Sequence, residues 1–421
     1  MTAITLQQPV PDGIRTIHFF NGRLLSGEDL SQEQDAQRKA RQQLGRTLGE
    51  GIAYGLQVSE TVGTSAPTSP IVTVSAGLAI NSCGQTLQLE QNTDLALARP
   101  LNLSTTSSPA VGFLPCQPSE SGVYIAGAGV YLLTMAPTAT SEGRADVNGL
   151  GNTTAPCNTR YTVEGVQFRL LQLPLSLAEL SDARLRNIIA YRCFAPEIQQ
   201  TFVRNPLGPR LDRRSVLDDL RPQFLTDADV PLALIYWTTA GIQFIDMWSV
   251  RRNITSPTAR TGVREQPLDD EQRIRAAEAM VSQFAEHIDH LRATRTDLAT
   301  IMASQLFRYL PPIGILPLSS GAIPGFTQQQ FFSQRVYRGP LYIEGARVEA
   351  LLRVASHYPP IDLGGQEMVW LYSVRENRDP AALAGNPAPQ PYLIFTSGQL
   401  QPATDARFNV NRWNYSNYTI A

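Results

Sequence analysis

The spacing of apolar residues predicts one long helix in the second half of the chain. Between Asp269 and Phe307, apolar side chains recur at alternating intervals of three and four residues, and Arg295 interrupts the series. This heptad pattern is typical of helices that pack side by side. We therefore expect a homo-oligomer with the interface residues Ile274, Val281, Phe284, Ile288, Leu291, Leu298 and Met302.

A second helix is predicted near the N-terminus, and it has no comparable apolar seam. Ser26 and Asp29 form a capping pair, and the residues up to Arg46 are nearly all good helix formers. A helix this polar is normally unstable unless something outside it holds it in place. Its few apolar residues are Leu30, Ala36, Ala40 and Leu44.

Short alternating or continuous apolar runs predict strands elsewhere. The segment after residue 50 reads as a strand, residues 71–90 as a hairpin-like pair around "NSCGQ", and Leu177–Phe194 as a short helix. Pro231–Thr238 and Ile242–Ser249 form the clearest hairpin, around "TAG". These elements predict a multi-domain α+β fold with short-stranded β domains, one long heptad-patterned helix and a mixed C-terminal domain.

Four domain ranges follow from this pattern. They are an N-terminal α+β domain (1–110), a β-rich middle domain with a short helix (120–255), the long helix with its seam (266–307) and a mixed C-terminal interaction domain (308–421).

Charge and apolar content indicate which kinds of partner molecule the protein is expected to bind. The net charge of −2 gives no electrostatic reason to expect nucleic acid or an anionic membrane as a partner. The chain shows no signal peptide and no apolar run near the ~20 residues of a membrane helix, which favours a cytoplasmic protein. Charged residues make up 17% of the chain, and such a sparsely charged surface suits burial against other proteins.

Metal and cofactor signals are weak. Cys83, Cys116, Cys157 and Cys193 lie 33 to 41 residues apart, and neither CxxC nor CxH occurs. Reduced thiols are the expectation, although Cys116 and Cys157 both lie in loop-like stretches that could approach each other. We expect no metal site and no cofactor.

The histidines offer no clear chemistry either. His287 and His290 are three residues apart on the long helix, and an exposed or partner-facing pair is expected because no third metal ligand can be named. His18 stands within the apolar run Ile17–Phe20 and reads as a packed strand residue. No P-loop, G-x-S-x-G or H-E-x-x-H motif occurs, so no catalytic residue is expected.

Two further features leave alternatives open. The carboxylate pairs Asp269/Asp270 and Asp362/Glu367 have the residue types that glycoside hydrolysis uses, but solvated or capping roles are the default. In the tail "RWNYSNYTIA", aromatic residues alternate with Asn and Arg. They could form a terminal strand of their own domain, a sugar-stacking platform, or a docking surface for another subunit. The aromatic residues concerned are Trp413, Tyr415 and Tyr418.

Several segments together resemble one group of proteins. "IHFFNGRLLSGEDLSQEQ", "LGEGIAYGLQV" and "VTVSAGLAINSCGQTLQL" are similar to the opening of phage-tail-like proteins that are encoded with extracellular contractile injection systems. "FRYLPPIGILPL", "PLYIEGARVEALL", "PYLIFTSG" and "ARFNVNRWNYSNY" are similar to their closing domain. The family often has Trp-Gly and Cys near the second strand, where this chain has "GEGIAYGL".

The resemblance implies a structural subunit without catalytic residues. Its partners would be other subunits of a contractile particle, at the baseplate or at a peripheral attachment, and the polar helix would be held by neighbouring chains. Two alternatives remain: an adhesin that binds cell-surface glycan through the aromatic tail, and a tail-associated glycan hydrolase. Binding to immobilised polysaccharide distinguishes the first, and release of reducing sugar distinguishes the second.

Overall fold

The computed structural model describes residues 14–22, 24–61, 70–97, 129–144, 159–194, 215–221, 223–238, 240–254, 270–320, 323–375 and 390–399. In this part the chain is a multi-domain α+β protein built of several small sheets and helices, as the sequence predicted. Among these residues, no helix is both long enough and apolar enough to cross a membrane.

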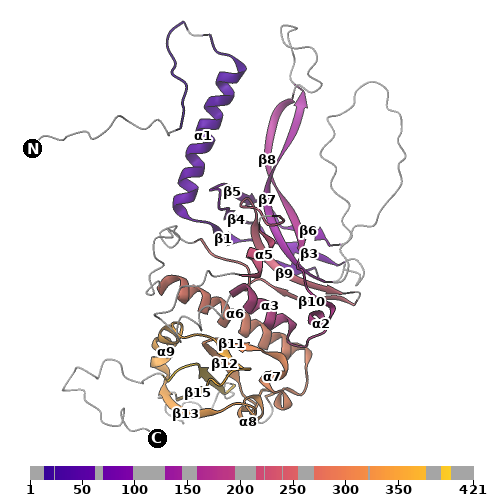
Figure 1. Ribbon diagram of the computed structural model, residues 1–421, viewed down its shortest axis with the longest axis vertical. Coiled ribbons are helices and arrows are strands. Elements are labelled where there is room, and N and C mark those ends of the chain that lie inside the picture. The colour runs from indigo at the N-terminus through magenta and orange to yellow at the C-terminus, as the bar shows by residue number, and fades with distance from the viewer. Residues whose placement is uncertain are drawn as a thin grey trace, which may run out of the picture.

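Two kinds of element project at one end of the molecule's long axis (Figure 1). One is helix α1 (Gly27–Leu48), and the other is the pair of long strands β7 (Gly129–Arg144) and β8 (Thr159–Gln172). The elements of the C-terminal region lie at the opposite end of this axis.

The segment that follows α1 forms two small antiparallel sheets with the strand orders β1-β4-β5 and β2-β3-β6. The predicted hairpin around "NSCGQ" is confirmed by the pairing of β4 with β5. The single strand predicted after residue 50 is wrong, because Leu56, with a φ of 54°, separates two strands that join different sheets. The strands are β1 (Gly51–Gly55), β2 (Val58–Glu60), β3 (Ile71–Val74), β4 (Gly77–Ile80), β5 (Thr86–Leu89) and β6 (Thr93–Ala96).

The middle of the molecule is a four-stranded sheet with the order β10-β9-β7-β8. Its β9–β10 hairpin confirms the prediction around "TAG". Leu232 and Ile235 of β9 pack toward the N-terminal sheets, whereas Leu234 and Tyr236 pack toward the helices on the other face. Because both faces of β9 are covered, its sequence is a continuous apolar run. The new elements are β9 (Val230–Thr238), β10 (Gly241–Asp246), α2 (Leu177–Leu180), α3 (Leu185–Phe194) and α5 (Val216–Leu220).

Strands β7 and β8 continue together beyond this sheet. Strand β9 pairs with β7 only up to Met135, whereas β8 pairs with β7 from Gln172 as far as Thr159. Residues 136–144 and 159–167 therefore form a two-stranded β-ribbon, a name used below for these residues. An isolated two-stranded hairpin is marginally stable in water at best, so this ribbon depends on what packs against it.

The long helix is shorter than the sequence predicted. Helix α6 (Asp270–Thr294) ends well before Phe307, and the 3₁₀ turn η2 (Leu298–Thr300) and the short helix α7 (Ala303–Leu306) follow it. The residues between α6 and η2 are Arg295, Thr296 and Asp297. Thr and Asp are weaker helix formers than the residues of α6, since they lose side-chain freedom or compete for backbone hydrogen bonds.

The C-terminal region is built on a four-stranded sheet with the order β12-β16-β15-β13, in which only the β13–β15 pair is parallel. The predicted strand, turn and short helix of "PLYIEGARVEALLRVAS" are confirmed by β13, η3 and α9. Beside this sheet, β11 pairs with β14. The elements are β11 (Tyr309–Leu310), β12 (Ile313–Pro317), α8 (Gln328–Phe331), β13 (Tyr337–Glu344), η3 (Gly345–Arg347), α9 (Val348–Ala355), β14 (Ile361–Asp362), β15 (Val369–Arg375) and β16 (Tyr392–Thr396).

The hydrophobic cores join regions that the sequence analysis treated as separate domains. One core combines Val72 of the N-terminal sheets with Leu133 and Ile235 of the middle sheet. Another combines Phe284 of α6 with Phe395 of the C-terminal sheet. The predicted ranges 1–110 and 120–255 therefore share one core, and the ranges 266–307 and 308–421 share another.

Candidate functional site

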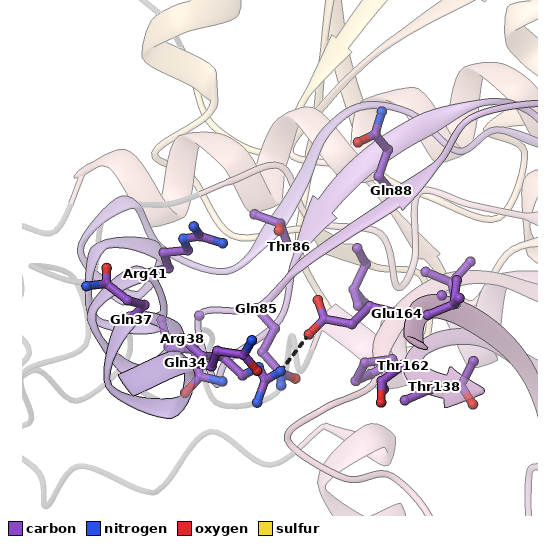
Figure 2. Close-up of a pocket in the computed structure, with 18 of the residues that line it drawn as sticks. Gln34, Gln37, Arg38, Arg41, Gln85, Thr86, Gln88, Thr138, Thr162 and Glu164 are labelled. Atoms are coloured by element: carbon purple, nitrogen blue, oxygen red, sulfur yellow. Dashed lines mark ion pairs between the residues drawn. The ribbon is translucent and has the colours of Figure 1, made fainter. Parts of the chain in front are cut away.

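A groove with a volume of about 1230 Å³ lies between α1 and the β-ribbon. Side chains from α1 form one wall, β5 forms the floor, and β7 and β8 form the other wall (Figure 2). Consecutive residues of β5 line it, so the open edge of that strand borders the groove. The labelled lining residues are Gln34, Gln37, Arg38, Arg41, Gln85, Thr86, Gln88, Thr138, Thr162 and Glu164.

Helix α1 is positioned by its two ends. At its N-terminus, the Ser26 hydroxyl accepts a hydrogen bond from the backbone N–H of Asp29, and the Asp29 carboxylate accepts one from the Ser26 N–H at 2.9 Å. Near its C-terminus, Gly45 lies so close to Gly84 that a Cβ on Gly45 would overlap the Gly84 carbonyl oxygen. Arg46 also donates to the Cys83 carbonyl at 3.2 Å. The turn between β4 and β5 therefore holds one end of α1.

One ion pair bridges the groove. Arg38 of α1 lies 3.1 Å from Glu164 of the β-ribbon, and it also pairs with Asp35 at 2.9 Å. The Arg38 and Glu164 side chains are 51% and 72% exposed, so this bridge contributes about 0–1 kcal/mol. It orients the ribbon relative to α1 more than it stabilises either element.

Two charged groups on the same wall form no ion pair within the described residues. The Oε1 atom of Glu33 accepts a hydrogen bond from the Gln37 amide at 3.2 Å, and its Oε2 atom is buried without a hydrogen-bond partner. Arg41 makes neither a hydrogen bond nor an ion pair with this part of the chain. Both residues line the groove. They are the groups of this wall that a bound molecule could still satisfy.

The groove offers both hydrogen-bonding and apolar groups. Amides, hydroxyls, guanidinium groups and carboxylates line it together with apolar side chains such as Leu87, Val163 and Val166, and neither histidine nor cysteine does. Within the described ranges, no cluster of three or more His, Cys, Asp or Glu side chains could hold a metal ion. The groove is therefore suited to a polar or polypeptide surface.

The predicted oligomer seam lies elsewhere, and most of it is buried in its own chain. Phe284, Ile288, Leu291 and Leu298 belong to the core that α6 shares with the C-terminal sheet. Phe284, only 2% exposed, packs against Phe307 and Phe395. The prediction that these side chains form an intermolecular interface is wrong, because the C-terminal region of the same chain occupies their face.

The remaining seam residues are partly buried. Val281 packs against the second core of the C-terminal sheet, and Ile274 and Met302 are half-buried. The predicted docking residues Trp413, Tyr415 and Tyr418 lie outside the described residues, as do Cys116 and Cys157.

The expectation of an exposed histidine pair is wrong for His287 but agrees with the exposure of His290. His287 is buried, its ring lies 4.7 Å from that of Phe307, and its Nδ1 has no hydrogen-bond partner. Burial and, to a lesser extent, the charge of the nearby Arg186 lower the pKa of His287 to about 3. His290 is exposed. His18 is exposed and lies outside any strand, so its prediction as a packed strand residue is wrong.

A buried polar cluster links the middle sheet to α6, and the sequence analysis missed it. Arg186 of α3 lies 2.9 Å from Glu286 and 3.7 Å from Asp246. Asp246 also accepts a hydrogen bond from Gln283 at 3.1 Å. These groups come from elements far apart in the sequence, and no local motif marks them. Their mutual contacts give the cluster a structural role at this junction.

Asp362 is held by contacts within its own region. Its carboxylate pairs with Arg308 at 3.1 Å and accepts the backbone N–H of Gly364 at 2.7 Å, so it caps a turn, one of the two roles expected by default. Asp269 lies outside the described residues. Of the cysteines, Cys83 and Cys193 carry free thiols, and burial raises the pKa of Cys193 to about 12.

Comparison of the chain with protein-family models and with curated proteins finds no match. The expectation of a phage-tail-like subunit therefore depends on the sequence motifs given above and on what the geometry adds to them.

Proposed function

We propose that this protein is a structural subunit of a phage-tail-like contractile particle, at its baseplate or a peripheral attachment, and that it acts through protein–protein interfaces. One structural observation supports the proposal: α1 and the β-ribbon project from the body of the molecule with little of their surface buried. Of the 22 residues of α1, only Ala36 and Gly45 are buried.

An exposed helix and an exposed two-stranded ribbon have low stability when nothing packs against them. A helix draws most of its stability in a protein from the packing of an apolar face, and α1 instead exposes Leu30, Leu44 and Leu48. The β-ribbon has open edges and exposes Tyr161 and Val163. Unpaired strand edges are sites where other chains add on, and natural proteins normally cover them. Neighbouring subunits that cover both elements provide the missing packing.

The proposal includes no catalytic role. The groove offers hydrogen-bonding groups, the Asp362 carboxylate is engaged by Arg308, and the ring of His287 is buried in the core. Each of these arrangements supports a structural role for the residues concerned.

The test is incorporation into particles. A tagged chain is expressed in the cells that encode it, particles are isolated by sedimentation, and their subunits are measured by mass spectrometry and electron microscopy. We expect the chain in the particle fraction. The variant Leu30→Asp/Leu44→Asp/Leu48→Asp should be lost from that fraction, while the control Leu177→Asp, which alters an exposed leucine far from α1, should remain. Absence of the unmodified chain from every particle would refute the proposal.

A second candidate function is glycan binding in the groove. The specific observation in its favour is the row of glutamine amides together with threonine hydroxyls and two arginines, all of which can hydrogen-bond to sugar hydroxyls. Isolated protein that binds immobilised polysaccharide, and loses binding when Gln37 and Gln88 are changed to Ala, would favour this adhesin role. Binding that is unaffected by these changes would count against the groove as the sugar site.

A further inference from the structure

The exposed face of α1 has a regular pattern of its own. Residues 30, 34, 37, 41, 44 and 48 follow one another at steps of four and three, so they form a single stripe along the helix. All six are exposed, and three of them, Gln34, Gln37 and Arg41, also line the α1 wall of the groove. Leucines occupy both ends of the stripe and polar side chains its centre: Leu30, Gln34, Gln37, Arg41, Leu44 and Leu48.

The charges of α1 are separated along its length. All four acidic residues precede Gln37 and all four basic residues follow it. Acidic residues near the start and basic residues near the end compensate the helix dipole, but that effect falls off within the first and last turns. Here the separation extends to the centre of the helix. In chain order, these residues are Glu28, Asp29, Glu33, Asp35, Arg38, Lys39, Arg41 and Arg46.

The pattern is symmetric about Gln37. Leu30 and Leu44 each lie seven residues from Gln37, and Glu33 and Arg41 each lie four residues from it. Two copies of α1 that run antiparallel would therefore place Leu30 of each copy beside Leu44 of the other. The same register would bring Glu33 of each copy beside Arg41 of the other. These are the two charged residues of this wall that form no ion pair within the described residues, although Glu33 accepts a hydrogen bond from Gln37.

We propose that α1 pairs in an antiparallel orientation with α1 of a second copy of this chain, around a two-fold axis near Gln37. The inference rests on the proposed role of α1 as an interface and names its partner. A two-fold interface uses the same patch on both subunits, which must therefore be self-complementary, and the stripe meets that requirement in its leucines and its charges. A single helix pair is a small interface beside the ~1200–2000 Å² of stable ones, so the association is concentration-dependent.

Cysteine cross-linking tests the register. The full-length Gln37→Cys variant should form disulfide-linked dimers under mild oxidation, because the two introduced cysteines face each other. Leu30→Cys and Leu44→Cys should each cross-link poorly alone and well when mixed. The control Gln43→Cys lies exposed on another face of α1 and should stay at the background set by the native cysteines. Mass spectrometry identifies the linked peptides. Cross-linking at Gln37 no greater than at Gln43 would overturn the proposal.

A charge exchange tests the contact independently. Arg41→Glu should lower the self-association constant about tenfold, since two opposite-charge pairs become like-charge pairs. The double variant Glu33→Arg/Arg41→Glu should restore it, which sedimentation velocity over a concentration series measures. Loss without restoration would overturn the proposed contact. If purified chains do not pair while the unmodified chain still enters particles, the partner of α1 is another subunit and only this inference fails.

Discussion

The two long helices among the described residues pack in opposite ways. Helix α6 places Phe284, Ile288 and Leu291 in the core of its own chain, where each is nearly inaccessible to solvent. Helix α1 is of similar length but exposes Leu30 and Leu44, which are 54% and 66% exposed. One helix is part of the body of the molecule, and the other projects from it.

The difference between α1 and α6 shows how much an apolar repeat in the sequence predicts about the packing of a helix. A regular three-and-four spacing indicates that a helix face is buried, but it does not tell which chain buries it. In α6 the covering surface is the C-terminal sheet of the same chain. In α1 the leucines are separated by polar residues, so the helix cannot form a core of its own, and we propose that another chain covers its exposed stripe.

The largest expected effect is a difference in the unfolding free energy lost when an apolar residue is truncated in α6 or in α1. Phe284→Ala should lower the free energy of unfolding by about 3–5 kcal/mol, because it leaves a cavity among packed aromatic rings. Leu44→Ala in α1 should change it by less than about 0.5 kcal/mol, as exposed substitutions do. Denaturant unfolding measures both. Equal losses for the two variants would show that α1 is packed in the isolated chain after all.

The second effect is confined to α6 and depends on pH. Burial holds the pKa of His287 at about 3, whereas an unfolded histidine has a pKa near 6.5, so the unfolded chain binds the proton first. Stability should therefore fall as the pH drops below about 6.5, by about 2 kcal/mol at pH 5 from this group.

The His287→Leu variant removes this proton-binding group and provides the comparison. Its unfolding free energy should depend less on pH between 6.5 and 5 than that of the unmodified chain. The same pH dependence in both proteins would show that His287 does not carry the effect. Helix α1 contains no histidine, so its unfolding should not follow this titration.

A third change acts on the attachment of α1. Gly45→Ala places a Cβ against the Gly84 carbonyl, and relieving this overlap should cost about 1–2 kcal/mol in the local packing of α1. We expect faster proteolysis within residues 27–48 and an unchanged melting of the body. Gly27→Ala is the matched control, since nothing lies within 4 Å of its added Cβ. Equal proteolysis of the two variants would contradict the contact with Gly84.

The smallest effect concerns the bridge across the groove. Because Arg38 and Glu164 are both largely exposed, a double-mutant cycle with alanine at each position should give a coupling of about 0.2–1 kcal/mol. Raising the salt concentration should reduce it further. A coupling above about 2 kcal/mol would mean that the pair is shielded from solvent, as by a neighbouring chain.

Local signals predicted much of the fold. The Ser26–Asp29 cap, the hairpin around "NSCGQ", the β9–β10 hairpin and the strand, turn and helix of residues 340–356 follow from capping, turn chemistry and periodicity, which act over a few residues. The partner of the α6 seam was not predictable, because that contact joins residues about a hundred positions apart.

The groove could not be predicted from the sequence either. It depends on the close approach of Gly45 to Gly84 and on the extension of the β-ribbon past the end of β9, and no local sequence pattern indicates either feature. The exposure of α1 could be predicted from the sequence, because residues 27–48 lack a continuous apolar face. That absence is the basis of the proposal that another chain stabilises this helix.

Hydrogen exchange tests the central claim that α1 is stabilised by another chain while α6 is stabilised by its own. Backbone amides of residues 27–48 and 270–294 are compared in dilute isolated protein and in the assembled state, whether concentrated protein or isolated particles. The account predicts that α6 is protected in both states and that α1 gains at least about tenfold protection only on assembly. Equal protection of α1 in both states would contradict the account.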